Sequence, residues 1–450
     1  MAAKGSSGVS IKPQEVHEVL SKHMLVDGFP FVLDLEKSHG SYLHDAATGK
    51  EYLDFFTFFA SSALGHNNPR FLEKDYLDKL ARVAVNKPSN SDLYTVEMAE
   101  FVETFARIAV PESMPNLFFV SGGALAVENA LKTAFDWKVR KNFAKGIKEE
   151  KGHKVIHFKE AFHGRTGYTM SLTNTDPAKT DYFPKFEWPR IENPKITFPL
   201  DEHLDEVVAR ETRAVEAIER VLAEDGDDIA AIIIEPIQGE GGDNHFRAEF
   251  FKELRRIADE NEVLLIFDEV QTGVGITGKM WCHQHFGVEP DIMSFGKKTQ
   301  VCGVMASNRI NDVDNVFKVS SRINSTWGGN LVDMFRSKKI FEIIEEENLV
   351  ENAAKMGELF KGHLLELQKN NSELVSNARG RGLFCAFDLP DTKVRDAFIT
   401  TLTNSGMIAL KCGPRTVRFR PALNVTSKEI DLAAELIDKS LKETLGGMDR

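Results

Sequence analysis

The sequence has little cysteine, no long apolar run and no excess of positive charge, and each lack excludes a class of protein. No apolar stretch approaches the roughly 20 residues that cross a bilayer, and residues 1–10 lack the apolar core of a secretory signal. Four cysteines without a Cys-x-x-Cys pair predict free thiols in a reducing compartment. With 56 Lys and Arg against 68 Asp and Glu, the net charge of −12 disfavours nucleic acid as a partner. We therefore expect a soluble cytoplasmic protein with a loose tail over residues 1–10.

The chain also shows no repeat of fixed period, which excludes solenoids and propellers. From about residue 116 to residue 302, short β-branched runs alternate with longer amphipathic stretches, which predicts an α/β fold with a mainly parallel sheet flanked by helices. Residues 230–234 and 263–267 are continuous apolar runs, as in strands buried on both faces. Apolar residues at helical spacing between these runs predict a crossover helix. A further helix is expected over residues 125–137, followed by an exposed helix end and surface loop over 138–154.

The pattern changes after Trp327, where a long charged helix is expected from about residue 331 to residue 368. Shorter elements follow and predict a separate, smaller α+β domain. These elements cover residues 382–387, 396–404, 407–410 and 417–419, with a last helix from residue 427. With 42% apolar residues, the 450-residue chain can fill two cores. The expected parts are an N-terminal segment that packs with the small domain (1–65), a large domain (66–330) and the small domain (331–450).

Carboxylates follow the two buried strands at their carboxyl ends. Glu235 follows the first strand, and Asp268 and Glu269 follow the second. Ligands of open α/β sheets bind beyond the carboxyl ends of the strands, so these acids point to a site. A glycine-containing loop (271–275) comes next, and Lys297 follows a further short apolar run. A lysine beside a glycine is usually a surface residue, but its combination with the acids and the glycine loop favours a functional site.

Lys297 and Asp268 are residue types that imine chemistry on a pyridinium cofactor requires. An imine-forming lysine needs a depressed pKa, which burial and neighbouring cations supply, and Lys298 is adjacent in the sequence. A carboxylate such as Asp268 keeps the ring nitrogen protonated, so that the ring accepts electrons from a substrate carbanion. The turn Ser121-Gly122-Gly123 precedes a helix and offers backbone N–H groups to a phosphate. By itself, that turn is equally typical of a plain strand-to-helix connection.

Eight blocks of the sequence match one known family in the right order. They are residues 64–69, 121–130, 161–166, 235–242, 268–273, 296–297, 325–330 and 417–419. At these blocks the chain resembles the class-III (ω-amino acid) pyridoxal-phosphate aminotransferases. The resemblance runs from about Leu64 to Pro421, which is most of the chain. It implies a type I pyridoxal-phosphate enzyme fold, a transaminase activity and the cofactor pyridoxal 5′-phosphate.

The resemblance also implies a role for each cofactor-binding residue. Lys297 holds the cofactor as an imine and moves protons during turnover. The other implied contacts are Asp268 with the ring nitrogen, Gln271 with the phenolic oxygen, Phe162 on the ring face, His163 and Glu235 near the ring, and Gly123 and Ala124 with the phosphate. The partner subunit's Thr326 is implied to complete the phosphate site. The expected functional unit is therefore a homodimer with shared active sites.

Substrate contacts are implied for two arginines and one glutamate. Arg165 and Arg418 match the carboxylate clamps of the family, and guanidinium suits bidentate binding of carboxylate. Glu240 matches a gating glutamate that pairs with the Arg418 position during the amine half-reaction. The expected partners are thus small molecules, with no nucleic acid and no membrane.

Within this family the chain is most similar to the lysine 6-aminotransferases. Three departures from the general pattern carry this similarity, namely the turn at 121–123, the stretch at 298–303 and Trp327. The expected reaction is a ping-pong transfer of the 6-amino group of L-lysine to 2-oxoglutarate, which gives 2-aminoadipate 6-semialdehyde and L-glutamate. The alternative is another donor of the family, which means ornithine, acetylornithine or 4-aminobutyrate.

Several other signals are interpreted as structural. Residues 282–285 (Cys-His-Gln-His) have metal-ligand residue types but lack the paired spacing of a zinc site, so no metal is expected. His66 is expected to be a packed loop residue, and Asp45 and Asp54 are expected to cap turns. The glycines at 239–242 are not followed by the GK[ST] of a phosphate loop. A nucleotide-binding module is therefore a remote alternative, and a non-catalytic scaffold is a weaker one.

Overall fold

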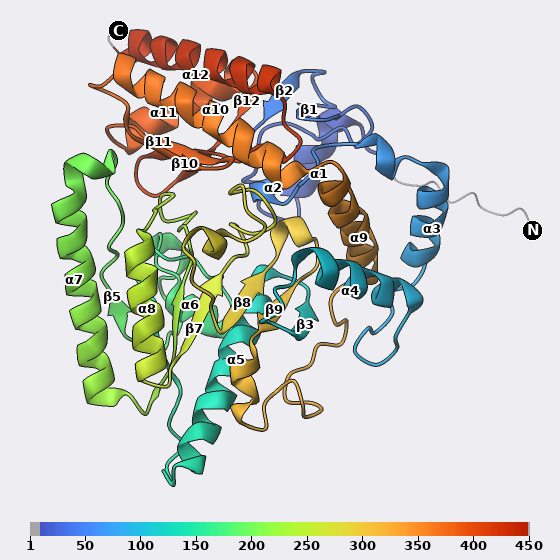
Figure 1. Cartoon of the computed structure of the whole chain (residues 1–450). Coiled ribbons are helices and arrows are strands. Elements are labelled where there is room, and N and C mark those ends of the chain that lie inside the picture. The colour runs from blue at the N-terminus through green and yellow to red at the C-terminus, as the bar shows by residue number, and fades with distance from the viewer. Residues whose placement is uncertain (1–9, 449–450) are drawn as a thin grey trace, which may run out of the picture.

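The computed structural model describes residues 10–448, so the tail expected over residues 1–10 lies outside it apart from Ser10. The central sheet has seven strands, which are β3 (Asn116–Val120), β4 (Lys154–Phe158), β5 (Arg190–Ile191), β6 (Ile229–Ile234), β7 (Leu264–Asp268), β8 (Ile292–Phe295) and β9 (Cys302–Ala306). Their order is β3-β9-β8-β7-β6-β4-β5 (Figure 1). Strands β8, β7, β6, β4 and β5 are parallel, whereas β9 is antiparallel to both of its neighbours. The prediction of a mainly parallel sheet is confirmed.

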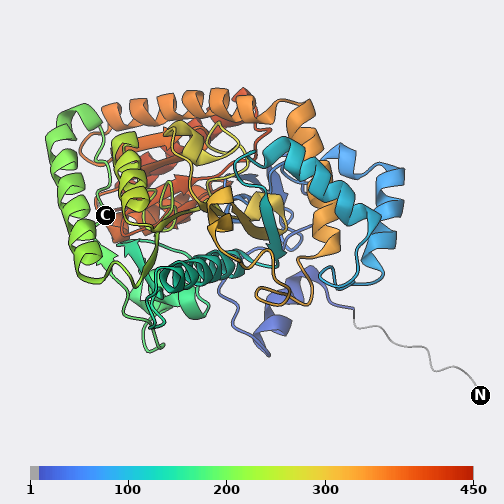
Figure 2. The same ribbon diagram turned by 60° about the horizontal axis from the view of Figure 1, so that its bottom comes forward.

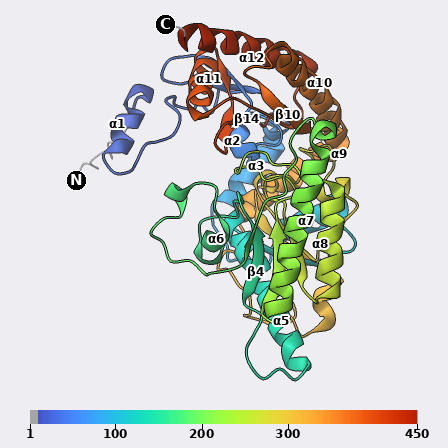
Figure 3. The same cartoon turned by 90° about the vertical axis from the view of Figure 1, so that its left-hand side faces the viewer.

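The continuous apolar sequences of β6 and β7 arise because successive side chains pack on opposite faces of the sheet. On one face, Ile232 joins a core cluster with helix α8 (Ala248–Glu260). On the other face, Ile233 joins a second cluster with helix α5 (Gly123–Ala144). Helix α7 (Leu200–Asp225) lies beside α8 (Figures 1 and 3). The two predicted strands and the crossover helix between them are confirmed.

A second, smaller domain contains an antiparallel sheet. Its elements are α9 (Leu331–Glu346), α10 (Leu349–Asn370), β10 (Ser376–Arg381), β11 (Phe384–Asp388), α11 (Thr392–Asn404), β12 (Met407–Ile408), β13 (Leu410–Cys412), β14 (Thr416–Phe419) and α12 (Ser427–Met448). The four-stranded sheet has the order β10-β11-β14-β13. In Figure 2, α5 (teal) and α10 (orange) lie on opposite sides of the molecule.

The N-terminal part of the chain pairs with this C-terminal part. Its elements are α1 (Val16–Ser21), β1 (Tyr42–His44), β2 (Glu51–Asp54), α2 (Thr57–Ala60), α3 (Lys74–Ala84) and α4 (Val96–Ala109), and α6 (Gly167–Leu172) lies further along the chain. Strand β2 is antiparallel to β1 and parallel to β12. A three-stranded sheet therefore joins the two ends of the chain.

The long helix expected over residues 331–368 is wrong, because two helices occupy this stretch. Helix α9 ends at Glu346 and α10 begins at Leu349. Asn348 between them has a left-handed backbone with φ of +51°. Asparagine tolerates this conformation better than most residues. The sequence carries no glycine or proline at this break, so the helical pattern runs through it.

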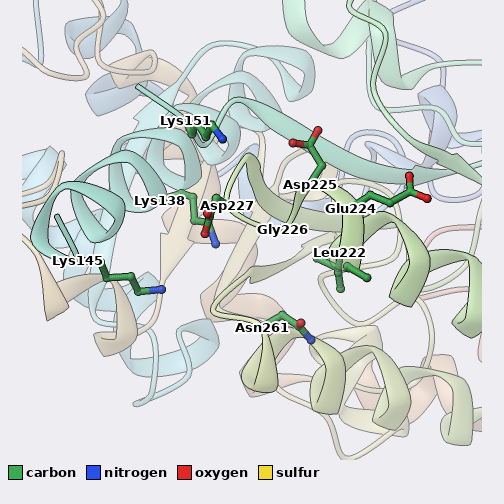
Figure 4. Close-up of a pocket in the computed structure, with 10 residues that line it drawn as sticks. Lys138, Lys145, Lys151, Leu222, Glu224, Asp225, Gly226, Asp227 and Asn261 are labelled. Atoms are coloured by element: carbon green, nitrogen blue, oxygen red, sulfur yellow. The ribbon is translucent and has the colours of Figure 1, made fainter. Parts of the chain in front are cut away.

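The helix end and surface loop expected over residues 138–154 are present, because α5 ends at Ala144 and residues 143–146 are exposed, but Lys138 at the start of this stretch is buried and not exposed. The ammonium of Lys138 donates a hydrogen bond to the backbone carbonyl of Glu262 (3.0 Å). Figure 4 shows Lys138 beside Lys145, Lys151 and Asp227 in a pocket at the C-terminal end of α5. The surface loop is limited to residues 145–153.

Two glycines of α10 differ in their surroundings, because one faces the segment around Gly382 and the other faces open space. A Cβ at Gly357 would lie 2.1 Å from the backbone carbon of Gly382, whereas a Cβ at Gly362 meets nothing within 4 Å. We expect Gly357→Ala to lower the free energy of unfolding by about 1–3 kcal/mol, because overpacking outweighs the better helix propensity of alanine. Gly362→Ala, the matched control, should raise it by about 0.5–1 kcal/mol. Urea unfolding measures both values, and a Gly357→Ala variant as stable as the control would contradict this packing.

Candidate active site

Two buried carboxylates lie at the carboxyl edge of the large sheet, because β6 and β7 are parallel and end at the same edge. Asp268, at the end of β7, accepts hydrogen bonds from Nδ1 of His163 (2.8 Å) and Oγ of Ser294 (3.1 Å). Glu235, just after β6, accepts hydrogen bonds from the backbone N–H groups of Phe162 (2.9 Å) and Gly239 (3.2 Å). Burial and the charge of Asp268 raise the pKa of Glu235 well above its ordinary value. The edge thus contains two acids in different environments.

Lys297 reaches this edge from the end of β8. Its Nζ donates a hydrogen bond to the backbone carbonyl of Phe59 (3.0 Å). Burial, with the nearby cations of Arg418 and Arg420, lowers the pKa of Lys297 from 10.5 to about 8. Lys298 instead donates to the backbone carbonyl of Gln271 (3.1 Å), and burial and Lys297 lower its pKa well below its ordinary value. The two lysines therefore have different partners although they are adjacent in the sequence.

The carbonyl that receives Lys297 belongs to an unusual turn. All four residues of α2 have positive φ, with +41° at Thr57, +53° at Phe58, +58° at Phe59 and +67° at Ala60. For residues other than glycine, this left-handed conformation costs roughly 1–2 kcal/mol each. Hydrogen bonds hold the turn, because Asp54 accepts from the N–H of Thr57 (2.8 Å), and the hydroxyl of Thr57 donates to the carbonyl of Arg420 (2.7 Å).

The start of α5 faces the same edge and offers an anion site. Gly122, at the helix N-cap, has φ of +125°, and among residues 10–448 no side chain caps this end. The first N–H groups of a helix have no intrahelical partner, so those of Gly123 and Ala124 are available to an anion. A Cβ at Gly123 would lie 2.9 Å from Cγ1 of Val270, so glycine allows the helix start to pack against the loop after β7.

Arg418 and Glu240 form an ion pair beside Lys297, with 2.6 Å between Nη2 of Arg418 and Oε2 of Glu240. The other carboxylate oxygen of Glu240 accepts from Nζ of Lys179 (2.6 Å), which also lies over the ring of Phe162 at 5.4 Å. Burial alone raises the pKa of Glu240, but Arg418 and Lys179 outweigh it and lower that pKa. Glu240 therefore stays ionised between two cations. Lys179 was not predicted from the sequence, because no motif marks it.

Arg420 and Asp243 are a second ion pair that the sequence reasoning missed. Nη2 of Arg420 lies 2.5 Å from Oδ1 of Asp243, and both side chains are fully buried. Nε of Arg420 also donates to Oε1 of Gln271 (3.2 Å). The spacing of Arg418 and Arg420 in an extended segment places both side chains on the same face, and this was the available signal.

Two predicted site residues lie apart from the cluster in the single chain. Arg165 is exposed, and within the described part of the chain it forms no ion pair or side-chain hydrogen bond. Its loop is held by Glu128, which accepts from the backbone N–H of Tyr168 (2.8 Å). Thr326 is also exposed, and its backbone carbonyl accepts from Oγ of Ser89 (2.6 Å). The other predicted residues contact the cluster or line the same edge of the sheet.

The residues interpreted as structural have structural partners. Asp45 accepts from the backbone N–H of Ala47 (3.0 Å), and Asp54 accepts from that of Phe56 (2.9 Å), so both cap turns as predicted. His66 is buried against Asp54, with 2.9 Å between Nε2 and Oδ2. The four cysteines are free and buried. Across residues 10–448, every helix is too short or too polar to span a bilayer.

The sequence model of the class-III aminotransferases matches residues 25–441. The chain belongs to this family. It is 54% identical to the L-lysine-epsilon aminotransferase of Mycobacterium tuberculosis strain H37Rv over 437 residues, which cover 97% of each chain. It is 51% identical to the enzyme of that name from Streptomyces clavuligerus, over 96% of this chain and 95% of that one. It is 32% identical to the human mitochondrial 4-aminobutyrate aminotransferase, over 92% of this chain and 85% of that one.

A solved structure agrees with the sequence comparison. The lysine aminotransferase from M. tuberculosis in the internal aldimine form superposes with a TM-score of 0.95 at 53% identity, over 96% of this chain and 100% of that one. The ω-transaminase from Pseudomonas jessenii in complex with PMP, at 24% identity and a TM-score of 0.82, shares the fold. The protein is therefore a pyridoxal-phosphate-dependent transaminase of small amino compounds, and the nucleotide-binding and scaffold alternatives are excluded.

The residues of this aminotransferase fit pyridoxal phosphate. Asp268 is a buried acid suited to a protonated ring nitrogen, and the uncapped start of α5 suits a phosphate. Lys297 has the lowered pKa that imine formation requires. The three groups come from three different elements and meet at one edge of the sheet.

The pKa of Lys297 gives a pH prediction for the apoenzyme. Only the neutral amine attacks the aldehyde of the cofactor, so capture should rise with pH and reach half its maximum near pH 8, the pKa of Lys297. Growth of the visible absorbance after addition of pyridoxal phosphate measures the rate. Lys298→Ala, the control, should keep the absorbance, and Lys297→Ala should lose it. A midpoint near 10.5, the ordinary lysine value, would contradict the proposed environment.

Proposed function

We propose that this aminotransferase moves the 6-amino group of L-lysine to 2-oxoglutarate by a ping-pong mechanism, giving 2-aminoadipate 6-semialdehyde and L-glutamate. The observation that carries this proposal is the Arg418–Glu240 ion pair beside Lys297, because Glu240 counters the positive charge that Arg418 brings to the reacting amine. The 54% identity to a protein named L-lysine-epsilon aminotransferase supports lysine as the donor. The alternative donors are ornithine, acetylornithine and 4-aminobutyrate.

The proposed cofactor contacts are those that the family resemblance implies, and the positions of the residues support them. Bound pyridoxal phosphate acts as an electron sink for the carbon that loses its proton. Asp268 holds the ring nitrogen, Gln271 the phenolic oxygen, and Phe162 one face of the ring. Glu235 keeps Phe162 in place by accepting from the backbone N–H of Phe162, and the imidazole Nδ1 of His163 holds the carboxylate of Asp268. Gly123 and Ala124 bind the phosphate with the partner subunit's Thr326.

Lys297 is the group that moves the proton. With a pKa of about 8, part of its amine is neutral near neutral pH, so Nζ can accept the proton from the 6-carbon of lysine. The same nitrogen returns a proton to the 2-carbon of the acceptor in the second half-reaction. Burial, together with the charges of Arg418 and Arg420, keeps this pKa low because it disfavours a positive charge on Nζ.

Glu240 acts as a gate between the two half-reactions. While it pairs with Arg418, no free cation near Lys297 attracts an α-carboxylate, so lysine binds with its α-carboxylate at the distant Arg165 and its 6-amine inward. The α-carboxylate of 2-oxoglutarate displaces Glu240 from Arg418, and Arg165 then holds its second carboxylate. After Glu240 leaves Arg418, it keeps its ion pair with Lys179. One site thus accommodates two substrates of different shape.

The functional unit we propose is a homodimer in the cytoplasm. Arg165 and Thr326 are exposed in the single chain, as are Tyr94 (80% exposed) and Trp327 (40%), which supports a covering subunit. Helix α1 stands away from the rest of the chain in Figure 3. The four free cysteines support a reducing compartment. Analytical ultracentrifugation tests the dimer, and a fully active monomer would exclude it.

The proposed division into domains assigns residues 66–330 to the large domain and 331–450 to the small one. Residues 1–65 are assigned to a segment that packs with the small domain. The pairing of β2 with β12 supports this assignment of the N-terminal segment.

A comparison of donors tests the proposed reaction. With 2-oxoglutarate as acceptor, kcat/KM for lysine should exceed that for ornithine by about tenfold or more. Ornithine is one methylene shorter than lysine, and a site fitted to one chain length discriminates against the loss of a methylene by roughly this factor. 4-Aminobutyrate, which lacks an α-amino group, is the second comparison. Glutamate release measures all three rates. A higher kcat/KM for ornithine or 4-aminobutyrate would replace lysine as the donor.

The gate predicts that two variants affect different half-reactions. In Glu240→Ala, Arg418 is free to bind any α-carboxylate, so 6-amino transfer from lysine should slow and α-amino transfer from glutamate should quicken. A charge-assisted hydrogen bond is worth about 1.5–3 kcal/mol, so the ratio of the rates should change about tenfold or more. Lys179→Met keeps the Arg418–Glu240 pair, so it should slow only the 2-oxoglutarate half-reaction. Single-turnover spectra measure each half, and an unaltered ratio in folded, yellow Glu240→Ala enzyme would exclude the gate.

A further inference from the structure

All three guanidinium nitrogens of Arg420 have hydrogen-bond partners within the protein, so this group, unlike that of Arg418, has no side left for a substrate. Nη1 of Arg420 donates to the backbone carbonyl of Phe419 (2.9 Å), and Nη2 donates to Asp243 (2.5 Å). Nε and Nη2 each donate to Oε1 of Gln271 at 3.2 Å. Cζ of Arg420 lies over the ring of Phe384, 3.3 Å from the ring centroid. Arg418, by contrast, has a buried Nε without a partner in the described part of the chain. Arg420 is therefore held in place as a structural cation, and Arg418 remains available to a ligand.

These contacts fix the orientation of the Gln271 amide. Guanidinium only donates hydrogen bonds, so the amide atom that faces Arg420 is the oxygen, and the NH2 group points away from it. Arg418 also approaches this oxygen, at 3.5 Å. A Cβ at Gly239 would lie 2.5 Å from Oε1 and 2.6 Å from Nε2 of Gln271, so the glycine loop packs closely against the amide. Rotation of the amide by half a turn would place its NH2 group against Arg420 and break both hydrogen bonds.

We propose that Arg420, with Asp243 as its counter-ion, is a positioning residue that turns the NH2 group of Gln271 toward the phenolic oxygen of the cofactor. This inference rests on the proposed contact between Gln271 and that oxygen. Asp243 is fully buried, so it balances the charge of Arg420 at a place that water does not reach. Arg420 acts through Gln271 and touches neither substrate nor cofactor.

The charged groups around Lys297 determine how the test is designed. Arg418 and Arg420 approach from the small domain, Glu240 from the loop after β6, Asp268 from β7, and Lys298 is its neighbour. Removing Arg420 alone would leave Asp243 as an uncompensated buried anion, which is strongly destabilising. The double variant Arg420→Gln/Asp243→Asn removes one charge of each sign and leaves the net charge of the site unchanged.

The experiment measures the pH midpoint of the visible absorbance of the holoenzyme and the dissociation constant of pyridoxal phosphate. A hydrogen bond from Gln271 stabilises negative charge on the phenolic oxygen, and its loss strengthens the hold of that oxygen on the proton at the Lys297 nitrogen. We expect the double variant to shift the midpoint upward by about one pH unit and to weaken cofactor binding about tenfold, as for loss of one hydrogen bond to a charged group. Gln271→Met should produce the same upward shift.

The matched control is the double variant Arg379→Gln/Asp388→Asn. This pair is also buried, with 2.9 Å between Nη2 and Oδ1, and Arg379 donates to the backbone carbonyl of Asp243 (2.9 Å) without contacting Gln271. It should lose thermal stability as the Arg420 variant does, with an unchanged pH midpoint. An equal shift of the pH midpoint in this control would mean that Arg420 has only a structural role, and it would overturn the inference.

The remaining outcomes separate this inference from the role of Gln271. A shift in Gln271→Met without one in the Arg420 double variant overturns the inference and leaves the Gln271 contact standing. No shift in either variant removes the Gln271 contact and the inference together, while the yellow holoenzyme still stands as a transaminase. If the double variant does not fold, Arg420→Lys keeps the charge beside Asp243 and loses one of the two bonds to Gln271. A smaller upward shift is then expected, and an unshifted midpoint overturns the inference.

Discussion

Two buried arginines of the small domain must find counter-ions in the large domain. Arg418 and Arg420 are 2% and 0% exposed, and a guanidinium without a partner at such depth would cost several kcal/mol. The loop after β6 supplies both counter-ions, Glu240 and Asp243. The contact between the domains and the geometry of the glycine loop depend on these two pairs, and the charges of the two arginines add to burial in lowering the pKa of Lys297. The site therefore lies where charged side chains of the two domains neutralise each other.

The two ion pairs differ in a way that suits their proposed roles. Asp243 and Arg420 are both fully buried, whereas the side chain of Glu240 is 26% exposed. Each oxygen of Glu240 has its own cation, Arg418 on one side and Lys179 on the other. A carboxylate with two partners can leave one without losing both. A fixed pair and an exchangeable pair therefore lie side by side on one loop.

The sequence predicted those parts of the fold whose signals are local. The strands and helix from residue 230 to residue 267 were predicted because their apolar patterns have a clear period. The break between α9 and α10 was not predicted, because the sequence has no glycine or proline beside Asn348. In the site, Lys297 and Asp268 were predicted from the acids at the strand ends and the glycine loop, and Glu240 was predicted from a family motif. Lys179 and Arg420 were missed because their partners lie 61 and 177 residues away in the sequence.

The left-handed turn of α2 has a consequence for how the start of the chain and the site depend on each other. Four residues in this strained conformation persist only where surrounding contacts hold them, and those contacts come from distant parts of the chain. The hydroxyl of Thr57 donates to the carbonyl of Arg420, and the carbonyl of Phe59 accepts from the amine of Lys297, which lies 238 residues away in the sequence. A short turn near the start of the chain is therefore shaped by the same lysine and arginine segment that build the site.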